Sequence, residues 1–149
     1  MKPLRLTFLF VLLFFMVAEG IAQVTSVPGQ AKENFAKQYP DAENVEWDND
    51  IIHVNVRFRL GDDEMNAEYN NKGVWKSTLK ESNYEDLPTE VKDGFMKSKF
   101  AGRDISDVKV VYLPGNIIQY RLKAEKNDVQ KKFLWFNDRG RLIRDSNTL

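Results

Sequence analysis

The sequence predicts an α+β protein built as a tandem repeat, in which each copy is one helix followed by a four-stranded antiparallel sheet. Three observations carry this prediction. A proline-led segment occurs twice, as VPGQAKENF and LPTEVKDGF; an alternating apolar–polar run follows each copy; and a closing turn recurs as YNNKGVW and FNDRGRL. Self-similarity of this kind is typical of two copies of one supersecondary unit. We place the copies at residues 27–86 and 87–146.

Each copy is expected to open with a helix. Pro28 and Pro88 suit the first helical turn, where the missing N–H leaves no hydrogen bond unmade. Pro40 ends the first helix, because proline cannot continue one, and Gly94 weakens the second without abolishing it. The apolar residues that share one helix face at i, i+4 spacing are Ala31, Phe35 and Tyr39 in the first copy, and Val91 and Phe95 in the second.

Strands follow each helix. The runs IIHVNVRFRL and NIIQYRLKA alternate strictly, as half-buried strands do. A short strand precedes each run, at residues 45–47 and 108–112, and a third ends at Tyr69 or Phe136. Gly73 and Gly140 then supply the positive φ of the last hairpin turn. The residues expected to point inward are Ile52, Val54, Val56, Phe58 and Leu60, and in the second copy Ile118, Tyr120, Leu122 and Ala124.

With one helix covering one face of each sheet, the other face is expected to stay open to water or to a partner. The repeat alignment places Phe133 and Trp135 on that open face, where the first copy has polar Asn66 and Glu68. Exposed aromatic patches often mark contact surfaces, and a basic rim suits protein docking. The alternative is that the two aromatics cover a gap between the sheets, or that loops or a chain terminus bury them. Alternation adds these basic residues to the open face: Arg57, Arg59, Lys76, Lys109, Arg121, Lys123 and Arg141.

The first 22 residues read as a secretory signal peptide, with a basic head at Lys2 and Arg5, an apolar run to Ala18, and cleavage before Gln23. The alternative, a membrane anchor, is disfavoured because the apolar run is shorter than the ~20 residues that span a bilayer. The chain has no cysteine, hence no disulfide and no site for a lipid on cysteine. A periplasmic or secreted protein without stable membrane insertion after cleavage is therefore expected.

Charge is balanced overall but uneven along the chain. Residues 27–86 carry 7 basic and 13 acidic side chains, whereas residues 87–149 carry 13 basic and 8 acidic ones. The two halves can offset each other within one molecule, or form a charged docking face that steers a partner. The near-neutral balance and the export signal argue against a nucleic-acid partner.

The sequence offers little for catalysis. His53 is the single histidine, expected on the outward side of a strand, and no serine lies in a nucleophile-elbow pattern. The acidic stretches around Asp50 and Asp62 lack calcium-loop spacing, and no glycine-rich phosphate loop occurs. We therefore expect no enzyme, no metal and no cofactor. A hydrolase of unrecognised type is the remaining enzymatic alternative, and His53→Ala would test it.

The proline-led helices, the stretch YPDAENVEW and the closing hairpin YNNKGVW resemble the PepSY-like family of exported bacterial proteins. The resemblance covers residues 27–144 and implies a fold like that of the β-lactamase inhibitor protein (BLIP), which grips an enzyme with its open sheet. Its motifs are structural, and the inhibitor's disulfide cysteines are missing, so inhibition of a β-lactamase is not implied.

Two functions follow as expectations. The first is a non-enzymatic module that docks an envelope or secreted protein through its open sheet face, with Phe133 and Trp135 at the centre and Arg57, Arg59, Arg121 and Arg141 around them. The second is a small-ligand or glycan binder in which Trp135 stacks on a planar group. The identity of the partner does not follow from the sequence.

Overall fold

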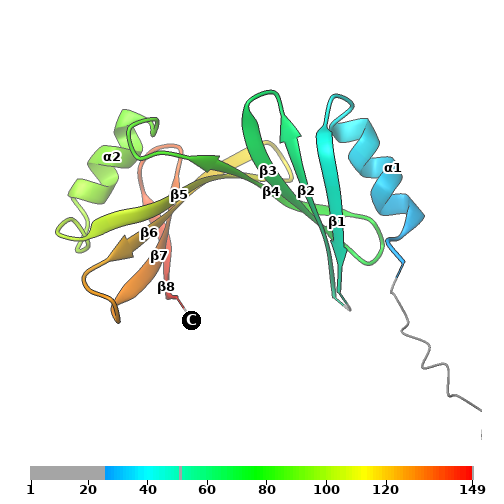
Figure 1. The fold of residues 1–149 in the computed structure, drawn as a ribbon. Helices are drawn as coiled ribbons and strands as arrows, with labels where there is room; N and C mark the ends of the chain where they lie inside the picture. The colour runs from blue at the N-terminus through cyan, green and yellow to red at the C-terminus, as the bar shows by residue number, and fades with distance from the viewer. Residues whose placement is uncertain (1–25, 51, 149) are drawn as a thin grey trace, which may run out of the picture.

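The structure is a computed structural model that describes residues 26–50 and 52–148. The expected signal peptide, residues 1–22, lies outside these residues. The described residues form two helices and eight strands, in the order α1 (Gly29–Gln38), β1 (Glu43–Asn49), β2 (His53–Leu60), β3 (Asp63–Asn70), β4 (Trp75–Ser82), α2 (Thr89–Met96), β5 (Asp104–Leu113), β6 (Ile117–Glu125), β7 (Lys131–Asn137) and β8 (Leu142–Asn147) (Figure 1).

The strands form one antiparallel sheet rather than two. Their order is β1-β2-β3-β4-β5-β6-β7-β8, so each strand pairs with its neighbours in the sequence. The two halves join where β4 pairs with β5, with Thr78 opposite Tyr112 and Ser82 opposite Val108. The sequence predicted a separate sheet for each half, because nothing in a local pattern reveals that two outer strands pair with each other. An α+β architecture with one open eight-stranded sheet is the result.

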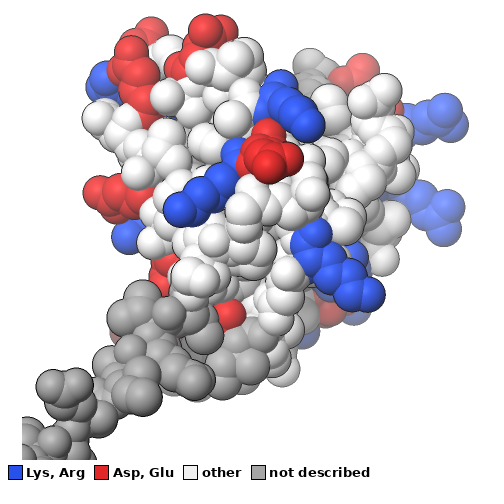
Figure 2. All heavy atoms as spheres, turned by 90° about the vertical axis from the view of Figure 1, so that its right-hand side faces the viewer, with Lys and Arg blue, Asp and Glu red and all other residues white. Residues whose placement is uncertain are grey.

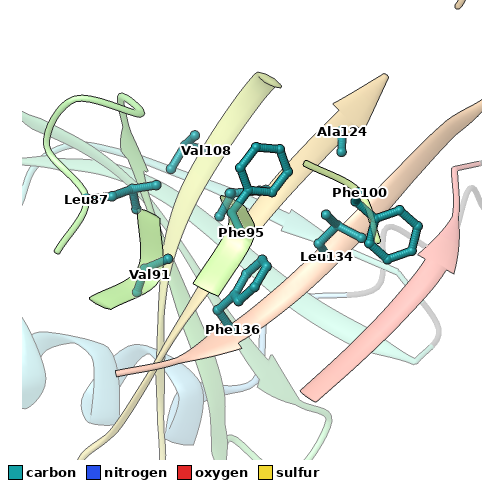
Figure 3. Packing of buried hydrophobic residues seen from close by; sticks show 9 residues of the cluster. Leu87, Val91, Phe95, Phe100, Val108, Ala124, Leu134 and Phe136 are labelled. Atoms are coloured by element: carbon teal, nitrogen blue, oxygen red, sulfur yellow. The ribbon is translucent and has the colours of Figure 1, made fainter. Parts of the chain in front are cut away.

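The sheet bends into an arch with both helices on its outer, convex side (Figure 1). This side carries two separate apolar cores. The core under α1 consists of Ala31, Phe35, Val54, Val56, Phe58, Ala67 and Tyr69. The core under α2 consists of Leu87, Val91, Phe95, Phe100, Val108, Leu122, Ala124, Leu134 and Phe136 (Figure 3). The inner, concave side of the arch is left without a helix, as the sequence predicted for one sheet face.

Helix α1 is held to the sheet mainly by aromatic packing. Phe35 is buried, and its ring centroid lies 5.0 Å from that of Phe58 and 5.3 Å from that of Trp47, both in edge-to-face geometry. This geometry is favourable because the positive ring edge meets the negative ring face. The helix ends where the Tyr39 N–H donates to the Phe35 carbonyl, one residue before Pro40. The predicted helix face is therefore confirmed.

The repeated glycine turns lie against the helices. Gly73 has φ +75° and Gly140 has φ +72°. A Cβ on Gly73 would lie 2.6 Å from the Ala31 backbone nitrogen, and one on Gly140 would lie 1.8 Å from the Glu90 carbonyl oxygen. Each turn thus requires glycine for two reasons: its φ is positive, and its backbone lies too close to the start of the helix to leave room for a Cβ. This explains why the chain carries the same turn in both halves.

Gly94 in α2 has a related role. A Cβ at this position would lie 1.8 Å from the carbonyl oxygen of Gly140. The sequence indicated only that Gly94 lowers helix propensity. The structure adds that the missing side chain lets α2 approach the β7–β8 turn closely.

Two of the residues expected to point inward do not enter a core. Ile52 precedes β2 and is 66% exposed, because the Asp50 carboxylate accepts hydrogen bonds from the backbone N–H groups of Ile52 and His53 and turns the chain there. Ile118 lies in β6 but is 38% exposed, because it falls between the two cores. Strands β1 and β5 are also longer than predicted.

Thr78 connects α1 to the middle of the sheet. It is fully buried, its Oγ1 lies 2.6 Å from the Tyr39 hydroxyl, and it accepts a hydrogen bond of 2.9 Å from Trp75 Nε1.

Thr78→Val removes this oxygen and leaves the indole N–H of Trp75 unpaired. We expect a loss of about 1–3 kcal/mol in the free energy of unfolding, measured by urea denaturation. Thr78→Ser, which keeps the oxygen, is the control, and a valine variant as stable as wild type would contradict the prediction.

Candidate protein-docking surface

The concave face of the sheet carries the aromatic pair that the sequence singled out. Phe133 and Trp135 lie in β7. Leu134 and Phe136 alternate with them along this strand and are fully buried in the core on the convex side of the sheet. The two aromatics are partly exposed, with ring centroids 5.9 Å apart in edge-to-face geometry. Because the sheet is continuous, there is no gap between sheets for them to cover.

Two arginines pack on these rings. The Arg144 guanidinium carbon lies 3.7 Å from the centroid of the Trp135 ring, and that of Arg121 lies 4.6 Å from the centroid of Phe133. Cations are attracted to the negative faces of aromatic rings. Arg121 also contacts Asp107 at 3.3 Å, which holds it in place across the sheet. The result is a preformed cluster of two rings and two cations, which we call the aromatic–arginine cluster.

Arg144 was missed by the sequence reasoning. It lies directly opposite Trp135 in β8, because a β-bulge between Trp135 and Phe136 shifts the register by one residue. The same bulge occurs between Glu68 and Tyr69 in the first half. Strict alternation selected Arg141 instead, which lies in the turn before β8 begins at Leu142 and not on the sheet face. The bulge is the physical reason for this correction.

A shallow groove of about 540 Å³ runs from β3 to β8 across the middle of the concave face. Its floor is apolar, with Val111 buried and Leu79 and Leu113 partly buried. The two ends of the groove differ in charge. Glu68 makes the β3 end acidic, and Arg121 and Arg144 of the aromatic–arginine cluster make the opposite end basic. Interface cores of this kind are apolar with a polar rim.

Arg57 and Arg59 do not belong to this cluster. They lie in β2, five strands from β7, which is roughly 24 Å along the sheet at the usual strand spacing. Arg57 lies 3.4 Å from Glu46 and Arg59 lies 2.7 Å from Glu43, both in β1. The predicted basic rim is therefore two separate groups, and the group in β2 is paired with its own acidic neighbours.

One ion pair crosses the join between the two oppositely charged halves. Lys109 of β5 pairs with Glu81 of β4 across the seam, and the other ion pairs of the described residues form within one half. The α1 end of the molecule shows acidic and basic side chains close together (Figure 2). Ion pairing among the described residues is therefore mostly local to each half, and the Lys109–Glu81 pair joins the two.

The concave face also holds polar atoms that the described residues leave unpaired. Arg59 Nε, Asn66 Oδ1 and Arg121 Nε are buried without a hydrogen-bond partner in this part of the chain. Unpaired buried groups are rare in folded proteins. All three belong to strands β2, β3 and β6 on this one face, so the face carries polar groups whose hydrogen-bonding capacity its own side chains do not use.

Glu125, at the end of β6, is held by Ser106, Lys123 and Lys131. The Ser106 hydroxyl donates to it at 2.5 Å, and with the ammonium groups of Lys131 and Lys123 it lowers the pKa of the Glu125 carboxyl to about 2. Because folding lowers the pKa of Glu125, its contacts with Ser106, Lys131 and Lys123 stabilise the folded state at pH values above the ordinary glutamate pKa. This stabilisation is lost as the pH falls toward 2.

We therefore expect a carboxyl ¹³C titration of Glu125 to have its midpoint near pH 2. In the Ser106→Ala variant this midpoint should move upward, because the largest cause of the shift is removed. Ser77→Ala, which alters a serine on a different strand, is the matched control. The assignment is wrong if Ser106→Ala leaves the titration where it is.

The structure places His53 as an exposed residue of β2. Its Nδ1 lies 3.9 Å from Asp50 and its Nε2 lies 3.7 Å from Glu68, so both nitrogens face carboxylates rather than a hydroxyl. In residues 26–50 and 52–148 no group of three histidine, aspartate or glutamate side chains is placed to hold a metal ion. In the same residues no helix has the length and apolarity to cross a bilayer.

Comparison with known proteins supports a BLIP-like fold. A DUF2874 family protein from Bacteroides ovatus is 25% identical, with 82% of this chain and 88% of that chain aligned and a TM-score of 0.75. A BLIP-like protein from Bacteroides fragilis is 20% identical over 83% of this chain and 87% of that one, with a TM-score of 0.74. A Bacteroides eggerthii protein inferred to be periplasmic is 19% identical over 82% and 89%, with a TM-score of 0.72. No protein-family model matches the sequence, and neither does any curated protein.

Proposed function

We propose that this protein is an exported, non-enzymatic binding module that docks an envelope or secreted protein through the concave face of its sheet. The observation that carries the proposal is the aromatic–arginine cluster, with Arg144 3.7 Å from the Trp135 ring at one end of an apolar groove. Tryptophan and arginine are among the residues that most often dominate binding energy at protein interfaces. The BLIP-like and periplasmic descriptions of the structural neighbours are consistent with this function.

The proposal includes the organisation of the chain. Residues 1–22 act as a cleavable signal peptide, and residues 23–149 form one domain of two repeated units, 27–86 and 87–146. The matching contacts of Gly73 and Gly140 with their helices support the repeat. The likeness to the PepSY-like family belongs to the proposal as well.

A glycan stacked on Trp135 is the less favoured function. A sugar that stacks on tryptophan needs a free ring face. The Arg144 guanidinium already covers one face of the Trp135 ring at 3.7 Å, and Phe133 packs nearby in edge-to-face geometry. A sugar would have to displace Arg144, whereas a protein side chain can pack beside it.

The test is a pull-down from the periplasm of the source cells with wild type and with the Phe133→Ser/Trp135→Ser double variant. A matched control, Val74→Ser/Met96→Ser, removes two apolar side chains that are 51% and 60% exposed outside the concave face. We expect one protein to be retained by wild type and by the control but not by the Phe133/Trp135 variant. Equal retention by all three would exclude the cluster as the docking site.

A further inference from the structure

The convex side of the sheet has a second pocket, at the waist between the two cores. It has a volume of about 320 Å³ and lies between the end of α1 and the β5–β6 hairpin. This size is at the lower end of the range for small-molecule sites, which is about 300–1,000 Å³. It shares one residue, Leu113, with the groove of the concave face, but its other lining residues are different.

The fold produces this pocket because each helix covers only its own half. Helix α1 ends at Gln38, and α2 lies over the strands of the second core, so Tyr112 at the seam belongs to neither core. The β5–β6 turn passes through Gly115 at φ +82° and Asn116 at φ +57°. It leaves Ile117 and Ile118 at the waist, 52% and 38% exposed.

The lining is uncharged, in a chain of which 30% is charged residues. Tyr39, Trp75 and Tyr112 supply three aromatic rings, four further side chains are aliphatic or methionine, and two are amides. Small-molecule pockets characteristically combine apolar walls with a few placed polar groups. A charged ligand would lose its hydration here without meeting an opposite charge.

The polar groups point to a hydrogen-bond acceptor on the ligand. Thr78 Oγ1 accepts from the Trp75 indole at 2.9 Å, and Gln38 Nε2 donates to the Tyr39 hydroxyl at 3.2 Å. Either hydroxyl can be the donor in the 2.6 Å contact between Thr78 and Tyr39. When Thr78 is the donor, the Tyr39 oxygen accepts that hydrogen bond, and the phenol proton of Tyr39 is free to bind an acceptor on a ligand. A tyrosine phenol is protonated at neutral pH, and burial raises the pKa of Tyr39 further.

We propose that the waist pocket binds an uncharged, largely apolar small molecule that carries one hydrogen-bond acceptor such as a carbonyl, which takes the Tyr39 phenol proton. The ligand's apolar body lies between the rings of Trp75 and Tyr112 and the side chain of Ile118. This site is separate from the protein-docking surface, and neither function depends on the other.

The experiment uses prodan, a neutral naphthalene with one carbonyl, whose emission shifts to the blue in apolar sites. We expect saturable binding to the wild-type protein. Ile118→Asp, which places a charge in the uncharged pocket, should weaken binding at least tenfold. Tyr39→Phe, which removes one hydrogen bond, should weaken it about fivefold.

The matched control is Ile143→Asp, which makes the same change at a residue 46% exposed in the concave groove, and it should bind prodan like wild type. Circular dichroism establishes that each variant is folded, and Ile117→Asp replaces Ile118→Asp if the latter is not. The proposal is overturned if wild type shows no saturable binding, if the pocket aspartate leaves affinity unchanged, or if Ile143→Asp causes an equal loss.

Discussion

Gly140→Ala is expected to lower the free energy of unfolding by about 3 kcal/mol or more, because a side chain at this position is strained and also collides with α2. The φ of +72° is unfavourable for alanine, which costs about 1–2 kcal/mol. The new Cβ would also lie 1.8 Å from the Glu90 carbonyl oxygen, so α2 must move away from the β7–β8 turn. Urea denaturation followed by circular dichroism measures the loss.

Gly115→Ala is the matched control for this prediction. Gly115 also lies in a hairpin turn at φ +82°, but no atom lies within 4 Å of a Cβ built there. This variant should show only the cost of the positive φ, about 1–2 kcal/mol. Equal losses in the two variants would mean that the helix contact contributes nothing. Gly94→Ala collides with the same turn from the helix side and should also destabilise the protein, but by less, because Gly94 has no positive φ and alanine has the higher helix propensity.

Phe136→Ala is expected to cost about 3–5 kcal/mol, the usual range for truncating a fully buried phenylalanine. Phe136 is 0% exposed in the core under α2. Because the two cores share no residue, we expect the loss to be local. Backbone amides of β6 and β7 should lose protection from hydrogen exchange, while those of β2 and β3 keep most of theirs.

Phe58→Ala makes the same change in the core under α1, where Phe58 is 1% exposed. Its exchange pattern should be the reverse, with protection lost in β2 and β3 and kept in β6 and β7. If either variant loses protection equally in both halves, the sheet unfolds as one cooperative unit despite its separate cores.

Much of the secondary structure could be predicted from the sequence because its signals are local. Proline marking a helix start, i, i+4 spacing of apolar residues and strict alternation over Val54, Val56 and Phe58 each depend on a few neighbouring residues. Pro28 and Pro88 lie at the N-cap, one residue before the predicted first turn. Placing Phe133 and Trp135 on the face without helices also followed, because the repeat alignment puts them at the positions of polar Asn66 and Glu68 in the first copy.

The features that the sequence could not reveal depend on contacts between distant residues. Because β4 pairs with β5, the structure has one sheet where the sequence predicted two. Because of a single bulge in the β7–β8 pairing, Arg144 lies beside Trp135, where the sequence predicted Arg141. The function of Gly94 requires knowing that α2 lies on the Gly140 turn. The waist pocket likewise exists only because neither helix reaches the seam, which no local pattern encodes.

The strand order has a consequence for how the protein folds as it emerges from the ribosome. Every strand pairs only with strands adjacent to it in the sequence, and α1 packs on strands that follow it within the same half. Such local pairing keeps the loops that must close during folding short, which favours rapid folding for a β-rich chain. The first core can therefore assemble before residue 87 appears, and the second half then folds by adding strands to the finished edge of β4.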